Sequence, residues 1–141
     1  EVSTELAPLP SLTADTTELA QIWVNIIKNA CDAMEQAGTP SPAIRISTGV
    51  FRAEGVSLLP AEYIRVSISN NGPSIPPEIQ DKIYQPNFTT KKLGLDFGLG
   101  LGLSIVRRIV DSYNGAIALQ SDATGTTFTV NIPTSPINGN H

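Results

Sequence analysis

Apolar residues recur at helical spacing along two segments of this chain. The members of the first apolar face are Leu19, Ile22, Trp23, Ile26, Ile27, Ala30 and Met34. Repetition at intervals of three and four residues predicts an amphipathic helix. Asp15, followed three residues later by Glu18, fits its start, and Gly38 fits its end. Residues 101–113 carry a similar face and predict a second helix.

Other segments alternate apolar and polar residues, which predicts strands. The expected strands are residues 5–12, 44–51, 63–68, 116–120 and 126–132, with a short helix at 76–84. Prolines place the first of these strands at a sheet edge. The order of elements favours the α+β class, as a two-layer α/β sandwich whose mixed, mostly antiparallel sheet is covered on one face by about three helices. We expect one domain over residues 1–135, with a long hairpin connection at 54–60 and a disordered tail at 136–141.

Composition narrows the classes of partner. The chain has 141 residues and a formal net charge of -4, with no basic stripe that could neutralise the phosphates of a nucleic acid. No apolar run approaches the roughly 20 residues that a membrane helix needs, so we expect no membrane contact by this domain. Cys31 is the only cysteine, which excludes an internal disulfide and suits a reducing compartment. We expect a cytoplasmic location, in a full-length protein that a membrane anchor could hold.

A glycine-rich stretch precedes the second predicted helix. Gly94, Gly98, Gly100 and Gly102 alternate with leucines and lead directly into the apolar run. Glycine lets a ligand approach the main chain, and amides at a helix start attract anions. The pattern is typical of a phosphate-binding loop. A flexible Gly/Leu loop is the alternative.

Four polar residues share one side of the first helix. Gln21, Asn25, Asn29 and Asp32 are separated by four, four and three residues, although asparagine is a mediocre helix former. A solvated helix face explains this stripe if the helix is taken alone. The functional alternative is a row of oxygen ligands lining a cleft, where an Asn carbonyl would bind Mg²⁺ together with substrate phosphates and water.

The run QIWVNIIKNACDAM at 21–34 resembles the asparagine box of sensor histidine kinases. They share an ATPase superfamily with DNA gyrase, MutL proteins and a heat-shock chaperone. The resemblance implies the Bergerat ATP-binding fold. It assigns Asn29 to the Mg²⁺ that bridges the ATP phosphates and Asp32 to a nucleotide contact. Asn25 stands where the hydrolases carry a water-activating glutamate. An amide accepts no proton at neutral pH, which favours a kinase over a hydrolase.

The run ISNNGPSI at 68–75 resembles the first glycine box of these kinases. Gly72 matches the glycine beneath the adenine, and Ile75 belongs to the same box. The family's aspartate, which accepts a hydrogen bond from the adenine amine, is Asn70 here. We expect weaker adenine binding and weaker discrimination against guanine. Ser74 replaces the second glycine and would be strained if its φ were positive.

The remaining boxes follow in the order that the family predicts. Matches to the start of the nucleotide lid are Phe88, Thr89, Thr90 and Lys91, and Lys91 is a candidate phosphate contact. The second glycine box is matched by Gly98, Leu99, Gly100, Leu101 and Gly102, with Leu99 replacing a hydroxyl residue. GTTFTVNIP at 125–133 resembles the closing box, in which we assign Thr127 to a hydroxyl near the adenine.

The resemblance implies the ATP-binding catalytic domain of a two-component sensor histidine kinase, with ATP and Mg²⁺ as cofactors. The residues assigned to catalysis are Asn25, Asn29 and Lys91. The only histidine, His141, is terminal, so the phosphoacceptor histidine is expected on a separate dimerisation domain. From there the phosphoryl group would pass to a response regulator receiver domain. The isolated domain is expected to be monomeric and the intact protein homodimeric. A degenerate module that binds partners without nucleotide, and an ATP-hydrolysing relative, are the alternatives.

Overall fold

The computed structural model describes residues 2–6, 15–53, 61–85 and 101–134. Their strands form a five-stranded sheet in the order β1-β2-β3-β5-β4. The strands are β1 (Val2–Glu5), β2 (Ile44–Ala53), β3 (Ala61–Asn70), β4 (Ala116–Asp122) and β5 (Gly125–Pro133). β1 pairs with β2 in parallel, and the other pairs are antiparallel. The sheet is therefore mixed and mostly antiparallel, which confirms the prediction.

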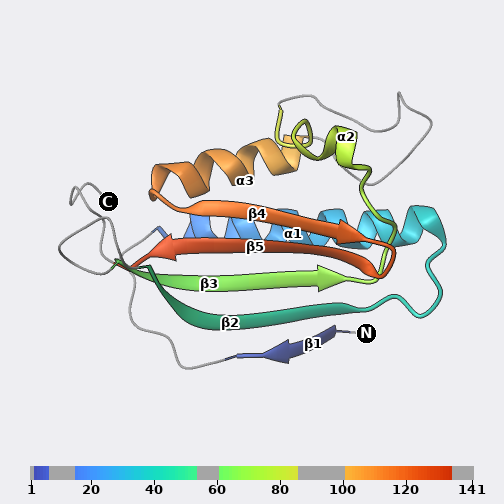
Figure 1. Ribbon diagram of the computed structural model, residues 1–141, viewed down its shortest axis with the longest axis horizontal. Helices are drawn as coiled ribbons and strands as arrows, with labels where there is room; N and C mark the ends of the chain where they lie inside the picture. Colours follow the sequence, from blue (N-terminus) through green and yellow to red (C-terminus); the bar gives the residue numbers. More distant parts are fainter. Residues whose placement is uncertain (1, 7–14, 54–60, 86–100, 135–141) are drawn as a thin grey trace.

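Three helices lie on one face of this sheet, as Figure 1 shows: α1 (Thr16–Ala37), α2 (Pro77–Gln80) and α3 (Leu101–Ser112). The Asp15 side chain accepts hydrogen bonds from the amides of Thr17 and Glu18 at the start of α1. Gly38 ends the helix in the left-handed conformation, with φ 63°. These caps satisfy backbone groups that have no partner within the helix. Both long helices thus begin and end close to the predicted positions.

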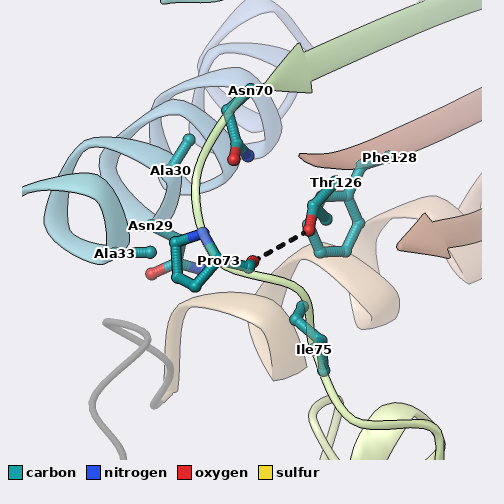
Figure 2. A pocket seen from close by; sticks show the side chains of 8 residues that line it. All are labelled: Asn29, Ala30, Ala33, Asn70, Pro73, Ile75, Thr126 and Phe128. Atoms are coloured by element: carbon teal, nitrogen blue, oxygen red, sulfur yellow. Dashed lines mark hydrogen bonds between the residues drawn. The ribbon is translucent and has the colours of Figure 1, made fainter. Parts of the chain in front are cut away.

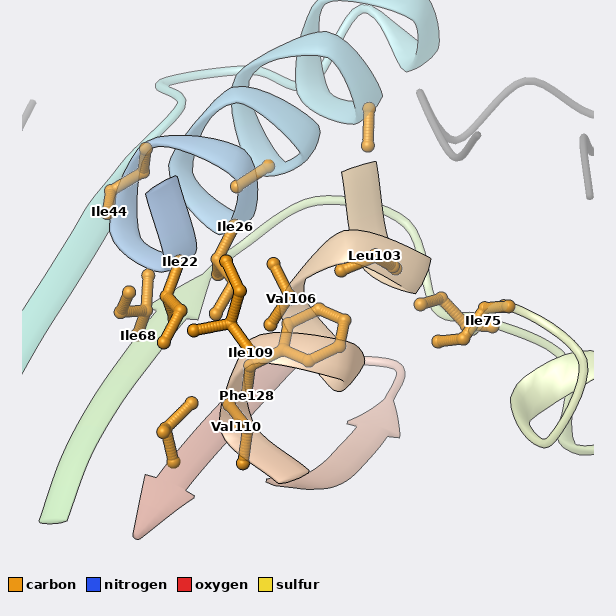
Figure 3. Close-up of a cluster of buried hydrophobic side chains, with 14 of the residues drawn as sticks. Ile22, Ile26, Ile44, Ile68, Ile75, Leu103, Val106, Ile109, Val110 and Phe128 are labelled. Carbon is orange, nitrogen blue, oxygen red and sulfur yellow. The ribbon is translucent and has the colours of Figure 1, made fainter. Parts of the chain in front are cut away.

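The core lies between α1, α3 and the covered face of the sheet (Figure 3). Its largest fully buried side chains are Ile22, Ile26, Ile68, Ile83, Leu103, Val106, Val110 and Val130. They come chiefly from the predicted apolar faces of both helices and from β3 and β5. Removing such side chains from water is the main stabilising contribution to the fold. No helix in the described part of the chain is long and apolar enough to cross a membrane.

The first strand is displaced from its predicted position. It was expected at residues 5–12, whereas the structure has it at Val2–Glu5 and leaves Leu6 outside it. Its pairing partner, β2, lies some forty positions along the chain, so the local sequence carries little of the signal. α2 is also shorter than the expected helix at 76–84. The predicted connection at 54–60 and the tail at 136–141 lie outside the described residues.

Alternation along β5 separates the two faces of the sheet. Thr126, Phe128 and Val130 are buried towards the helices. Thr127 and Thr129 point to the open face, where their hydroxyls pair with Ser69 and Ser67 of β3. Consecutive strand residues face opposite ways, so the register of β5 decides which threonine can belong to a site under the helices.

Candidate functional site

A small cavity lies where the ends of β3 and β5 meet α1 (Figure 2). Its lining residues are Asn29, Ala30, Ala33, Asn70, Pro73, Ile75, Thr126 and Phe128. Three of them, Asn29, Asn70 and Ile75, were predicted from the sequence. The cavity volume is about 20 Å³, enough for about one water molecule. A purine could enter only if the walls moved apart.

Asn29 is the most unusual polar residue of the site. It is 8 % exposed, and its Nδ2 is the one buried side-chain polar atom without a hydrogen-bond partner among the described residues. Leaving a buried polar group unpaired costs roughly 1–3 kcal/mol. A Cβ on Gly102, in the first turn of α3, would lie 3.7 Å from this Nδ2. Burial excludes the solvated-face interpretation for Asn29 and places it beside the start of α3, where the helix dipole favours negative charge.

The rest of the polar stripe differs from Asn29 in its surroundings. Asn25 is partly buried, and its Nδ2 donates to the backbone oxygen of Gly102 at 3.1 Å. Its Oδ1 accepts from Gln21 Nε2 at 3.4 Å, and Gln21 itself is exposed. Asp32 is half-buried and does not line the cavity. Asn25 and Asn29 therefore share Gly102 as a neighbour.

Asn70 is held by the segment that follows β3. Its Oδ1 accepts a hydrogen bond from the Gly72 amide at 2.9 Å. A Cβ on Gly72 would lie 2.9 Å from both Asn70 Oδ1 and Met34 Cγ, so a larger residue at 72 would displace the Asn70 side chain. The next asparagine, Asn71, points elsewhere, since its side-chain amide bonds to the backbone of Ser41 and Ala43.

A chain of hydroxyl groups fixes the far wall of the cavity. The Ile75 amide donates to Ser121 Oγ at 2.7 Å, and Ser121 Oγ lies 2.7 Å from Thr126 Oγ1. Thr126 Oγ1 donates to the backbone oxygen of Pro73 at 3.4 Å. The segment after β3 is thereby tied to the β4–β5 hairpin. Ser121 was not predicted, because a serine at the end of a strand gives no signal of such a role.

Thr127, predicted from the sequence to lie near the adenine, does not line this cavity. Thr127 lies on the open face and bonds to Ser69 Oγ at 2.8 Å, whereas Thr126 is 4 % exposed and lines the cavity. Two adjacent threonines in an alternating strand gave no indication of which one points inward. Thr126 therefore supplies the hydroxyl that lines the cavity.

Two backbone positions also correct the sequence interpretation. Ser74 is exposed and does not have a positive φ, so the strain considered for it is absent. The residue under constraint is Gly125, which has φ +145° and where a Cβ would lie 2.0 Å from the Asn70 backbone oxygen. In the sequence, the position of Gly125 at the start of the GTTF run was the available indication of this constraint.

The structure brings together only part of the predicted site. Phe88, Thr90, Lys91, Gly98, Leu99 and Gly100 lie outside the described residues, and Leu101 is placed as the first residue of α3. Within the described ranges no group of three or more acidic, histidine or cysteine side chains could hold a metal.

The fold and this site define a recognised class of domain. Residues 14–136 match the family described as histidine kinase-, DNA gyrase B- and HSP90-like ATPase, and the chain belongs to this family. The predicted resemblance is therefore confirmed.

Among curated relatives, the chain is 35% identical over 125 residues to the sensory histidine kinase/phosphatase NtrB of Vibrio alginolyticus, covering 89% of this chain and 34% of that protein. It is 33% identical over 135 residues to NtrB of Rhizobium meliloti (strain 1021), covering 90% and 33%. The chain spans about a third of the length of these relatives.

Solved structures of histidine kinases have the same fold as this chain. The catalytic domain of the histidine kinase ThkA in a nucleotide-free form is 33% identical, with a TM-score of 0.71 over 96% of this chain and 80% of that chain. ThkA in complex with the response regulator protein TrrA gives a TM-score of 0.68 at 30% identity, over 96% of this chain and 34% of that chain.

Proposed function

We propose that this chain is the ATP-binding catalytic domain of a sensor histidine kinase. In this role it would hold Mg·ATP and present the γ-phosphoryl group to a histidine on a separate dimerisation and phosphoacceptor domain. The observation that carries the proposal is Asn29, a buried amide with an unpaired Nδ2 beside Gly102 at the start of α3. A stable fold has little reason to bury such a group unless a ligand uses it.

The residues present fit a magnesium ion bound chiefly through a nucleotide. Mg²⁺ usually takes one or two protein oxygens and completes its shell with phosphates and water. Asn29 would supply the protein oxygen, and a bound Mg²⁺ would neutralise charge on the phosphates during transfer. The first turn of α3 favours negative charge at the same place.

Kinase chemistry suits Asn25 better than hydrolysis does. Both polar atoms of its amide are engaged, Nδ2 with Gly102 and Oδ1 with Gln21. An amide does not take a proton from water at neutral pH. Phosphoryl transfer instead depends on positioning and on charge neutralisation, which Asn29 and the start of α3 are suited to provide.

The proposal extends to location and partners. We expect a cytoplasmic domain that is monomeric alone and belongs to a homodimeric protein. Its direct partner would be the phosphoacceptor domain of that protein, followed by a response regulator receiver domain. Support comes from ThkA, a relative at 30% identity that was solved in complex with a response regulator.

Titration calorimetry with Mg·ATP and Mg·ADP tests the proposal. We expect saturable binding that Asn29→Ala abolishes and that Asn131→Ala, on the open face of the sheet, leaves unchanged. No binding at millimolar nucleotide would contradict the proposal and favour a degenerate module that binds partners only. Sustained phosphate release by the isolated domain, lost in Asn29→Ala, would favour the hydrolase instead.

A further inference from the structure

We propose that Ser121 and Gln80 are positioning residues of the nucleotide site, which act by holding Ile75. The inference rests on the proposed nucleotide site and identifies what keeps one wall of that site in place. Ile75 and Pro73 line the cavity, whereas Ser121 and Gln80 do not. We therefore expect the effect of these two polar side chains on a ligand to pass through the segment that they hold.

Ile75 is held through both polar groups of its backbone. Its amide donates to Ser121 Oγ at 2.7 Å, and its backbone oxygen accepts from Gln80 Nε2 at 2.8 Å. The Ile75 side chain is 5 % exposed and belongs to the hydrophobic core. Attachments to β4, to α2 and to the core thus fix this one residue of the cavity wall.

The other end of the same segment is also held. The side chain of Asn71 bonds to the backbone of two residues that precede β2, at 2.9 and 3.0 Å. Between these ends, Pro73 accepts only the longer bond of 3.4 Å from Thr126, which is the weaker geometry. Pro73 can therefore shift at the cavity between two fixed ends, of which Ile75 is one.

Removal of the Ser121 hydroxyl should release this fixed end. Ile75 is buried, so its amide would be left without a partner, which is unfavourable. The segment can relieve this cost by moving its backbone towards solvent. Nucleotide binding would then have to order the wall in addition to making its contacts, and a site that is less preorganised binds more weakly.

Gln80 extends the same control to α2. It is the last residue of that helix, and its side chain reaches back five residues to the Ile75 oxygen. A helix of one turn is unstable in isolation, so the orientation of α2 depends on contacts such as this one. A displacement of α2 should therefore change the position of Ile75 and, through it, the affinity for nucleotide.

The test compares variants that each remove one polar group. Calorimetric Kd values for Mg·ATP are measured on the unmodified chain, Ser121→Ala, Ser121→Thr and Ser69→Ala. Ser121→Thr keeps the hydroxyl. Ser69 is the matched control, because it forms a similar hydroxyl pair of 2.8 Å with Thr127, on the open face of the sheet. Gln80→Met is compared in the same way with Gln36→Met, at an exposed position near the end of α1.

A second measurement follows Ile75 directly. Hydrogen exchange of its backbone amide is recorded by NMR at a temperature where thermal unfolding shows every variant to be folded. We expect exchange at Ile75 to be about tenfold faster in Ser121→Ala than in the unmodified chain and Ser121→Thr. A general loss of stability would accelerate exchange throughout the core, whereas loss of this anchor accelerates it at Ile75.

We expect Ser121→Ala to weaken Mg·ATP binding about fivefold, equivalent to about 1 kcal/mol, and Ser121→Thr to restore it. Gln80→Met should weaken binding about threefold, whereas Ser69→Ala and Gln36→Met should leave it unchanged. Equal affinities of Ser121→Ala and Ser69→Ala, or unchanged exchange at Ile75 in Ser121→Ala, overturn the inference while leaving the proposed function intact. Absence of binding by the unmodified chain overturns the proposed function and the inference together.

Discussion

The hydroxyl of Tyr113 donates a hydrogen bond of 2.8 Å to Glu18 Oε1. The same hydroxyl accepts one of 2.9 Å from the Asp15 amide. Tyr113 follows the last turn of α3, whereas Asp15 and Glu18 stand at the start of α1. A single buried phenol therefore joins the end of one long helix to the beginning of the other, although 95 residues separate Tyr113 from Glu18.

Replacing Tyr113 by phenylalanine should destabilise the domain. The change removes the shared hydroxyl, and we expect the free energy of unfolding to fall by about 1–2 kcal/mol. Urea unfolding followed by circular dichroism measures it. Tyr63→Phe, on the open face of the sheet, is the matched control and should change stability by less than about 0.5 kcal/mol. Equal losses in the two variants would contradict the role assigned to Tyr113.

The domain should lose stability at alkaline pH, because the fold raises the pKa of two tyrosines. Burial raises the pKa of Tyr84 from 10.0 to about 12, although the nearby Arg107 opposes this change, and burial also raises the pKa of Tyr113. The folded state thus keeps these protons at a pH where the unfolded state loses them. The contribution of Tyr84 is complete below pH 10 and declines as the pH rises towards about 12, and the contribution of Tyr113 is lost in the same direction. Urea unfolding at pH 9 and pH 11 should show this decline, and Tyr84→Phe should reduce it.

Gly125 should tolerate no side chain. With φ +145° and a Cβ that would lie 2.0 Å from the Asn70 backbone oxygen, Gly125→Ala should cost about 3 kcal/mol or more. Gly49→Ala is the matched control, because a Cβ at Gly49 meets nothing within 4 Å. It should be neutral or slightly stabilising. Thermal unfolding of both variants tests the contrast, and a folded Gly125→Ala of unchanged stability would refute it.

The two adjacent threonines give a direct test of the corrected assignment. Thr126→Val removes the hydroxyl that lines the cavity and breaks the chain from Ser121 to Pro73. We expect nucleotide affinity to fall several-fold and stability to fall by about 1 kcal/mol. Thr127→Val alters only the open face and should leave affinity unchanged. The reverse pattern in calorimetry would restore the original assignment of Thr127.

Asn29 should contribute to nucleotide binding and little to the stability of the fold. Its Nδ2 is buried and unpaired, so Asn29→Ala relieves a desolvation penalty of about 1–3 kcal/mol while leaving a small cavity that costs a similar amount. The unfolding free energy should therefore stay within about 1 kcal/mol of the unmodified chain, although nucleotide binding is lost. A large loss of stability would identify Asn29 as a structural residue.

The elements of the fold were predictable because their signals are local. Asp15 and Gly38 cap α1 as the sequence indicates, and apolar periodicity gives the core faces of α1 and α3. β1 was misplaced because its position depends on parallel pairing with distant residues of β2. Local alternation carries no information of that kind.

The site was predictable where a residue type conflicted with its local context. Asn29 in the middle of a helix is such a conflict, and it is buried as a ligand group would be. Thr126 and Thr127 show the limit, since a shift of one residue in a strand exchanges its two faces. The strain considered at Ser74 depended on its φ, which the residue type does not determine.

Two hydrogen bonds join α1 to α3 on one side of the cavity. Asn25 of α1 donates a hydrogen bond to Gly102 at the start of α3, and Tyr113, just after the end of α3, donates one to Glu18 of α1. The two helices are therefore joined at both ends of α3. A purine is larger than the cavity of about 20 Å³, so its binding is expected to displace the segment at residues 71–76. The longest bond holding that side is the one of 3.4 Å from Thr126 to Pro73. The segment at residues 71–76 is therefore expected to separate from β5 first at this bond.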